Sequence, residues 1–383
     1  MNAYKKRFRI TVLFLTICLC PFNSLQSLPT DSKIISSEEF LEIIDNFSED
    51  PGFYHSDNFV SNEESYLQVY RQLTTMGIRG GAYIGVGPEQ NFTYIAAIRP
   101  DIAFIVDIRR DALLQHLLYK ALFSYSATRY EFLSNLFCRQ LPMLGSSQTH
   151  NISTLLDNYS NVPVVDDGQF EKCFKKAMNS IENQTRFPLD NNDRFRLKYI
   201  YRAFMFAGSD ISYDFDFRHR PFRPGHQIRL KRLILQTDRN GRHKNFLLSD
   251  KDYNYVKLLH QENRIIPITG NFAGDRTFKQ ISQYLKLKKL RVSAFYVSNV
   301  EYFLMKKKGS YTQFVKNVNL LPVDSNSVFI RFLGIIGKNH KAHVGNDREA
   351  TVLQKISRFK SRQKTAPYKS LEELGREFLL KNR

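Results

Sequence analysis

The chain has 383 residues, of which 42% are hydrophobic, and its 56 Lys and Arg outnumber 37 Asp and Glu to give a formal charge of +19. This length accommodates two or three small domains or one large domain with an insertion, and the composition argues against disordered, collagenous and disulfide-stapled chains. Beyond the first 20 residues, no uncharged apolar run approaches the roughly 20 residues that span a bilayer, which excludes a polytopic membrane protein.

The charge is unevenly distributed along the chain. Residues 31–108 carry thirteen acidic and four basic side chains, whereas residues 109–383 carry a net charge of +24. This division indicates an acidic N-terminal segment on or near a basic body. Such a body has either an ordinary solvated surface or a surface that binds an anionic partner, nucleic acid or lipid.

The first residues have the order of a secretory signal peptide. Four basic side chains precede the apolar residues 10–20, and small residues follow at Ser24 and Ser27. We therefore predict a signal peptide over residues 1–28 and an exported protein that is periplasmic, bound to the cell envelope or secreted. A lipoprotein and an uncleaved anchor are the alternatives.

Two cysteines, Cys138 and Cys173, follow this segment. They predict either one disulfide in an oxidising compartment or two buried thiols. His340 and His343 stand three residues apart in a polar stretch, which favours a solvated loop over a pair of zinc ligands. No metal site is predicted.

The first α/β elements lie between two helical segments. Ser36 and Ser61 each precede a glutamate by three residues and predict capping boxes, the second opening a helix that runs to about Thr75. Residues 81–108 predict one βαβ unit, whose helix begins near Pro88 and whose second strand covers 102–108. Residues 111–123 have helical spacing.

The α/β pattern resumes after an Asn-rich and Asp-rich stretch with helices near 168–182 and 193–207. Helices are expected over 249–261, 275–287 and 299–314, strands over 264–272, 291–298 and 327–334, and a last helix over 370–381. We expect an α/β fold with a doubly wound, mainly parallel sheet and a large, mostly helical insertion. The segments are a signal peptide (1–28), a helical segment (29–80), the first half of the α/β domain (81–124), an insertion or cap (125–248), the second half (249–345) and a basic tail (346–383).

Two strand ends predict a nucleoside site. Gly85 and Gly87 end the first strand, and Asp107 ends the second strand twenty residues later. In a doubly wound sheet such a turn presents backbone N–H groups to a ligand, and the acid binds ribose hydroxyls. Glu89 stands where a pyrophosphate would face the helix, which disfavours NAD and suits a cationic ligand such as S-adenosylmethionine. An ion pair of Asp107 with a following arginine is the structural alternative.

The sequences YIGVGPEQNFTYIAA (83–97) and FIVDIRR (104–110) resemble those of class I S-adenosylmethionine-dependent methyltransferases. More narrowly, they are similar to uncharacterised, often exported bacterial proteins with a methyltransferase-like Rossmann fold. The resemblance covers about residues 60–125 and 249–335. It implies a cofactor site formed by Gly85, Val86, Gly87, Glu89, Asp107, Ile108, Asn271 and Asn299. It also implies that the helix carrying Asn62 and Glu64 closes over the cofactor.

These patterns lead to three functional hypotheses. The first is an exported methyltransferase-like protein that binds S-adenosylmethionine, with an unknown acceptor and unknown catalytic residues. Because this cofactor is not expected outside the cytoplasm, the second is a non-catalytic binding protein with a basic surface for anionic partners. The third is an NADP-binding oxidoreductase, in which Arg109 and Arg110 bind the 2′-phosphate.

Overall fold

The computed structural model describes residues 34–140, 152–159, 162–214, 228–345, 347 and 349–378. The predicted signal peptide lies outside the described residues. Within the described part of the chain, no helix has the length and apolarity needed to cross a membrane.

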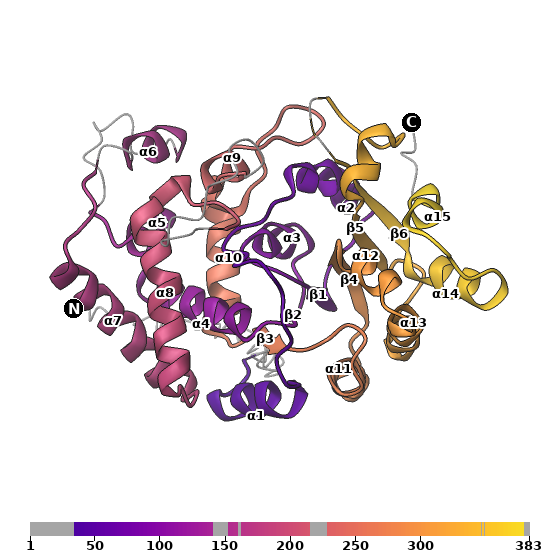
Figure 1. Ribbon diagram of the computed structural model, residues 1–383, viewed down its shortest axis with the longest axis horizontal. Coiled ribbons are helices and arrows are strands. Elements are labelled where there is room, and N and C mark those ends of the chain that lie inside the picture. The colour runs from indigo at the N-terminus through magenta and orange to yellow at the C-terminus, as the bar shows by residue number, and fades with distance from the viewer. Residues whose placement is uncertain are drawn as a thin grey trace, which may run out of the picture. The chain divides into compact units, whose positions relative to one another are not determined.

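A six-stranded sheet with the order β3-β2-β1-β4-β5-β6 organises the fold (Figure 1). Its strands are β1 (Ala82–Gly85), β2 (Ile102–Asp107), β3 (Ile265–Thr269), β4 (Val292–Ser298), β5 (Val328–Phe332) and β6 (Thr351–Lys355). Strands β1 to β5 are parallel, and β6 is antiparallel to β5. The predicted α/β class with a mainly parallel sheet is therefore confirmed. The strand order reverses between β1 and β4, and such a reversal opens a crevice at the carboxyl ends of the strands.

Helices cover both faces of the sheet. The α-helices of the described residues are α1 (Ser37–Phe47), α2 (Tyr70–Thr75), α3 (Gln90–Ile98), α4 (Arg110–Tyr125), α5 (Arg129–Phe137), α6 (Ile152–Tyr159), α7 (Asp167–Thr185), α8 (Asn191–Ala207), α9 (Leu230–Ile234), α10 (Asp250–Gln261), α11 (Thr277–Leu287), α12 (Val300–Lys306), α13 (Ser310–Leu320), α14 (Ile356–Thr365) and α15 (Leu371–Arg376). Helices α3, α4 and α10 pack together on one face, and α1, α11, α13 and α14 form a row on the other.

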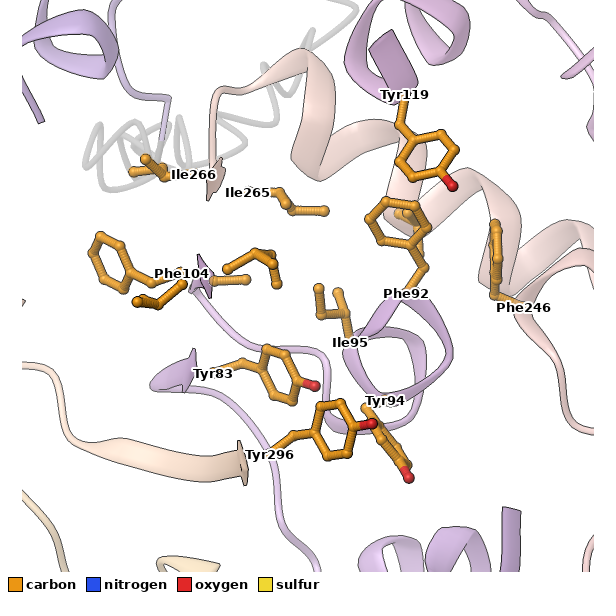
Figure 2. Packing of buried hydrophobic residues seen from close by; sticks show 14 of the residues in the cluster. Tyr83, Phe92, Tyr94, Ile95, Phe104, Tyr119, Phe246, Ile265, Ile266 and Tyr296 are labelled. Carbon is orange, nitrogen blue, oxygen red and sulfur yellow. The ribbon is translucent and has the colours of Figure 1, made fainter. Parts of the chain in front are cut away.

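Side chains alternate between these two faces because successive residues of a strand point in opposite directions. Phe104 of β2 packs against Phe47 of α1, whereas Tyr296 of β4 packs against Tyr94 of α3. On the α3 face, Phe92 makes edge-to-face contacts with the rings of neighbouring helices and loops (Figure 2). Both faces are thus buried, which explains the apolar β1 to β5 sequences.

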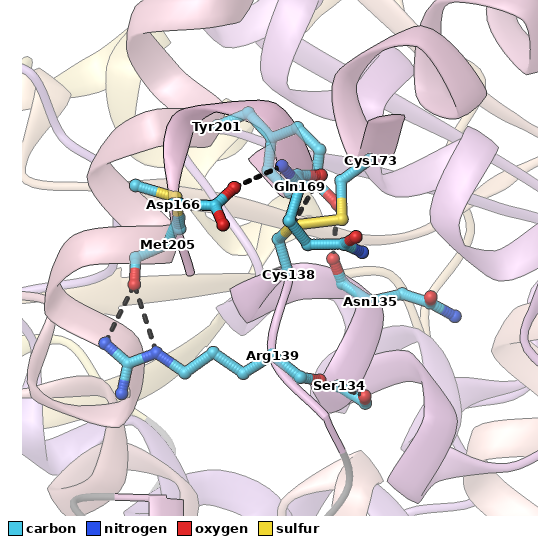
Figure 3. The surroundings of a disulfide bond; sticks show 9 residues. All are labelled: Ser134, Asn135, Cys138, Arg139, Asp166, Gln169, Cys173, Tyr201 and Met205. Carbon is cyan, nitrogen blue, oxygen red and sulfur yellow. Dashed lines mark hydrogen bonds between the residues drawn. A yellow bond between two sulfur atoms is a disulfide. The ribbon is translucent and has the colours of Figure 1, made fainter. Parts of the chain in front are cut away.

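The predicted insertion contributes helices α5 to α9, and its expected helices near 168–182 and 193–207 are confirmed as α7 and α8. Both pack against α4. Of the two alternatives for the cysteines, the structure has the disulfide Cys138–Cys173, which joins the end of α5 to α7 (Figure 3). Next to it, the Arg139 guanidinium donates hydrogen bonds to the carbonyls of Met205 and Phe206 at the end of α8.

Three local predictions were wrong. Ser61 caps no α-helix, because its hydroxyl donates to Oε1 of Gln90 and accepts from the N–H of Glu63. A 3₁₀ helix (Glu64–Val69) follows instead and leads into α2, which does end at the predicted Thr75. The expected helix over 299–314 is broken into α12 and α13 at Gly309, whose φ is +78°. The tail adds β6 and α14 before its predicted helix, which ends earlier as α15 and does begin at the predicted Ser370 cap.

Candidate functional site

A cavity of about 330 Å³ lies at the carboxyl ends of β1, β2, β3 and β4, where the strand order reverses. This is the position at which open α/β sheets bind ligands, and the volume is at the lower end of the range of about 300–1,000 Å³ for small-molecule sites. The walls come from the four strand ends, residues 53–63, Tyr213, α12 and the start of α13.

Six of the eight predicted cofactor residues line this one cavity. They are Val86, Gly87, Asp107, Ile108, Asn271 and Asn299. Gly85 and Glu89 are not among the lining residues. Gly85 has a packing reason to be glycine, since an added Cβ would lie 2.0 Å from Oδ1 of Asn91.

The turn after β1 is fixed by Asn91, a residue that the sequence reasoning missed. Its Nδ2 donates to the carbonyls of Val86 (2.9 Å), Gly87 (3.1 Å) and Pro88 (2.8 Å), and its Oδ1 accepts from the Tyr83 hydroxyl. Gly87 has a φ of +79°, which glycine adopts at no steric cost. These contacts within the protein hold the turn in one conformation.

Asp107 forms a two-point ion pair with Arg109 on the cavity wall. The Arg109 Nε lies 3.1 Å from Oδ1 and its Nη2 lies 3.1 Å from Oδ2, and both side chains are buried. This is the structural alternative that the sequence left open for Asp107. The next arginine, Arg110, pairs with Asp193 of α8 at 2.8 Å. Both arginines that an NADP phosphate would need are therefore already matched to carboxylates.

The loop after β3 is held by a carboxylate from another part of the chain. Glu49 accepts hydrogen bonds from the N–H groups of Asn271 (3.0 Å), Arg276 (2.8 Å) and Thr277 (3.0 Å). The Asn271 Oδ1 accepts from the Ala273 N–H at 2.9 Å, which is the turn-forming role of asparagine. Glu49 thus caps α11 and positions Asn271 at the cavity.

A buried carboxyl group, that of Glu63, lies on the cavity wall next to the end of β4. Its Oε1 accepts a hydrogen bond from the Ser298 hydroxyl, and its Oε2 accepts one from the Gln90 amide at 3.3 Å. Gln90 also donates to the Tyr296 hydroxyl at 3.0 Å. Burial raises the pKa of Glu63 to about 7. Ser298 has a φ of +50°, an unusual conformation for serine that is common at functional sites.

The sequence reasoning named the neighbours of Glu63 instead. Asn62 does line the cavity, whereas Glu64 does not and pairs with Arg232 at 2.6 Å. Glu89, at the start of α3, is buried behind the wall, where its Oε1 accepts from the N–H of Ser61 and its Oε2 has no partner within the described residues. Burial raises the pKa of Glu89 to about 7 as well.

Aromatic side chains border the cavity on its outer side. Phe53 is 89% exposed, and the rings of Tyr54 and Phe303 meet edge to face at 5.7 Å. The Tyr213 hydroxyl donates to that of Tyr54 at 3.1 Å. Lys307 also lines this part of the cavity. The arrangement offers flat apolar surfaces for a planar ligand group.

Metal chemistry has no support from side-chain clustering. Within the part of the chain that the structure describes, no group of three or more His, Cys, Asp or Glu side chains is placed to hold a metal ion. The His340 ring nitrogen lies 2.7 Å from the Gly375 carbonyl, so that it ties the tail to the loop before β6.

Comparison with known proteins gives a family for this arrangement but no activity. No curated protein matches the chain. The family model of DUF7790, a domain of unknown function, matches residues 58–378. The match includes all six strands and every cavity-lining residue except Phe53 and Tyr54. The chain therefore belongs to the DUF7790 family.

Proposed function

We propose that the protein binds a nucleoside-containing ligand of the S-adenosylmethionine type, in a methyltransferase-like Rossmann fold. The observation that supports this best is the convergence of residues from four separate strand ends on one cavity at the reversal of the strand order. The resemblance to S-adenosylmethionine-dependent methyltransferases implies these residues for this ligand, and they are far apart in the chain.

The side chains on the walls suit such a ligand. Asp107 Oδ2 receives one hydrogen bond from Arg109, and a carboxylate oxygen has two lone pairs, which leaves it capacity to accept from a ribose hydroxyl. Tyr54 and Phe303 provide ring surfaces for a base. Glu63 provides a carboxyl group for the cationic end of the ligand. When bound, S-adenosylmethionine would supply an electrophilic methyl group.

The structure bears differently on the NADP-binding oxidoreductase and on the non-catalytic binding protein. An NADP site is disfavoured because Arg109 and Arg110 are both paired with aspartates. A binding protein without catalysis would use the same cavity, so that the present proposal concerns binding and assigns no catalytic residue. An anionic partner on the basic surface remains a separate proposal, which no particular contact supports.

Calorimetric titration of the purified protein with S-adenosylmethionine and S-adenosylhomocysteine tests the proposal. We expect both ligands to bind, and Asp107→Asn to weaken both. Asp193→Asn is the matched control, because it alters the neighbouring ion pair to Arg110 outside the cavity. Absence of binding by the folded protein, or equal losses in the two variants, would contradict the proposal.

A further inference from the structure

The charged groups on the cavity walls differ in whether they have a partner of opposite charge. Among the residues that the structure describes, four acidic or basic side chains line the cavity: Glu63, Asp107, Arg109 and Lys307. Asp107 and Arg109 neutralise each other, and Lys307 is exposed to solvent. Glu63 is 1% exposed, and none of the ion pairs among the described residues includes it. It is therefore a buried acid whose protein partners are all neutral.

The groups that face Glu63 come from three elements. They are Tyr83 of β1, Gln90 and Tyr94 of α3, and Tyr296 and Ser298 of β4. Figure 2 shows the three tyrosine rings side by side, with Tyr94 and Tyr296 in contact. Burial holds the pKa of each phenol well above 10, so all three are neutral over the working pH range. The Ser298 and Gln90 donors position the carboxyl group without neutralising it.

We infer that Glu63 is the recognition site for a positively charged group of the ligand, an ammonium or a sulfonium, and that it exchanges its proton for that charge on binding. The inference rests on the proposed function and identifies which wall of the cavity selects the ligand's charge. In the exchange the carboxyl O–H bond breaks, the proton passes to solvent, and no bond of the ligand changes. The carboxylate then lies beside the cation.

The physical basis is the cost of a buried charge. An ionised carboxylate without a cation is unfavourable in a buried site, so Glu63 holds its proton more strongly than water-exposed glutamate does. A cation beside the carboxylate removes that penalty. Since the pKa of Glu63 is raised to about 7, ligand-free protein is mainly protonated at pH 6 and mainly ionised at pH 8. A cationic ligand should then bind about tenfold more tightly at pH 8 than at pH 6, and release a proton at the lower pH.

Calorimetry with three probes tests this at both pH values, in two buffers of different ionisation enthalpy. S-adenosylmethionine and S-adenosylhomocysteine carry a cationic group, and adenosine carries none. We expect wild-type protein to release close to one proton per bound S-adenosylmethionine at pH 6 and none per adenosine. Glu63→Gln should weaken S-adenosylmethionine at pH 8 by about tenfold or more and leave adenosine unchanged. In Glu63→Gln, the affinity for S-adenosylmethionine should no longer depend on pH, and binding should release no proton.

Glu64→Gln is the matched control, since it alters the adjacent buried glutamate, which lies outside the cavity and pairs with Arg232. It should bind all three probes as the wild type does. If the wild-type protein binds the nucleosides without releasing a proton, the inference is wrong and the proposed function still holds. The same follows if the wild-type protein binds S-adenosylmethionine no more tightly than adenosine. Binding of none of the probes by folded protein overturns both. The proton count uses wild-type protein, so it decides the question even where Glu63→Gln fails to fold.

Discussion

Arg331 and Glu301 form a buried ion pair that ties α12 to β5. The Arg331 Nε lies 2.5 Å from Oε2 and its Nη2 lies 3.2 Å from Oε1, and both side chains are 2% exposed. The guanidinium also lies over the ring of Phe329 and bonds Gln354 of β6. Because α12 supplies Val300, Phe303 and Leu304 to the cavity, this pair fixes one cavity wall.

Removing one partner of this pair should be costly. Glu301→Ala leaves the Arg331 charge buried and unpaired, and we expect a loss of about 3–5 kcal/mol in the free energy of unfolding. The measurement is urea denaturation followed by circular dichroism. Glu171→Ala is the control, because Glu171 pairs with Lys198 at the surface and should cost less than about 1 kcal/mol. Similar losses in both variants would show that the buried pair has no special role.

The Glu49 cap makes a prediction about the loop after β3. Glu49→Gln removes the negative charge at the start of α11, and we expect a loss of about 1 kcal/mol together with faster hydrogen exchange at the Asn271, Arg276 and Thr277 amides. Hydrogen exchange followed by mass spectrometry measures this. The exposed neighbour Asp50 provides the control, Asp50→Asn. Unchanged exchange over residues 270–277 in Glu49→Gln would contradict this role.

The sequence predicted the strands better than the site. The apolar runs of β1 to β5 stand out because helices bury both faces of the sheet. Strand β6, with the sequence TVLQK, has only two apolar residues, which are adjacent, and it lies in a basic tail, so its pairing with β5 depends on tertiary contacts. The spacing of apolar residues on either side of Gly309 is compatible with one continuous helix, and the break there depends on the positive φ of this glycine.

The cavity residues that the sequence predicts are those that stand at the ends of strands. Gly87 follows β1 and Asp107 ends β2, and the carboxyl ends of parallel strands meet at the same edge of the sheet. Their place at the cavity could therefore be predicted from their position in the sequence. Glu63 was missed because Ser61 and Glu64 suggested a capping box, a local pattern. The contact that gives Glu63 its place is with Ser298, 235 residues later. No local pattern reports a contact at that separation.

The raised pKa of Glu89 should make the free energy of unfolding depend on pH. Its folded-state pKa of about 7 lies above the ordinary value of 4.5 because the carboxyl is buried. The folded state therefore holds a proton that the unfolded state has released, and this contribution is fully present below pH 4.5 and lost as the pH rises through 7. Glu89→Gln should remove that loss, so its stability relative to wild type should rise by about 3 kcal/mol between pH 4.5 and pH 8.

Urea unfolding at several pH values measures the effect. The exposed Glu42 gives the control, since Glu42→Gln should leave the pH dependence of the wild type unchanged. A constant difference between Glu89→Gln and wild type from pH 4.5 to 8 would show that Glu89 does not titrate in this way.

The disulfide connects stability with the proposed export. Cys138 and Cys173 are separated by 35 residues, and a cross-link over such a loop stabilises by about 3–4 kcal/mol through the reduced entropy of the unfolded chain. The double variant Cys138→Ser/Cys173→Ser should lose that amount, and reduction of wild type should give the same loss. Reduction of the double variant is the control and should change nothing.

We propose export because the first 28 residues predict a signal peptide and because disulfides persist in oxidising compartments. Protein recovered from a secreting bacterial host should begin between residues 24 and 29 and yield the Cys138–Cys173 cross-linked peptide under non-reducing conditions. Protein produced in a reducing cytoplasm without residues 1–28 should carry both thiols free. N-terminal sequencing and peptide mass mapping measure both outcomes. An uncleaved N-terminus together with reduced thiols in the secreting host would refute export, because each of the two signals would then have failed independently.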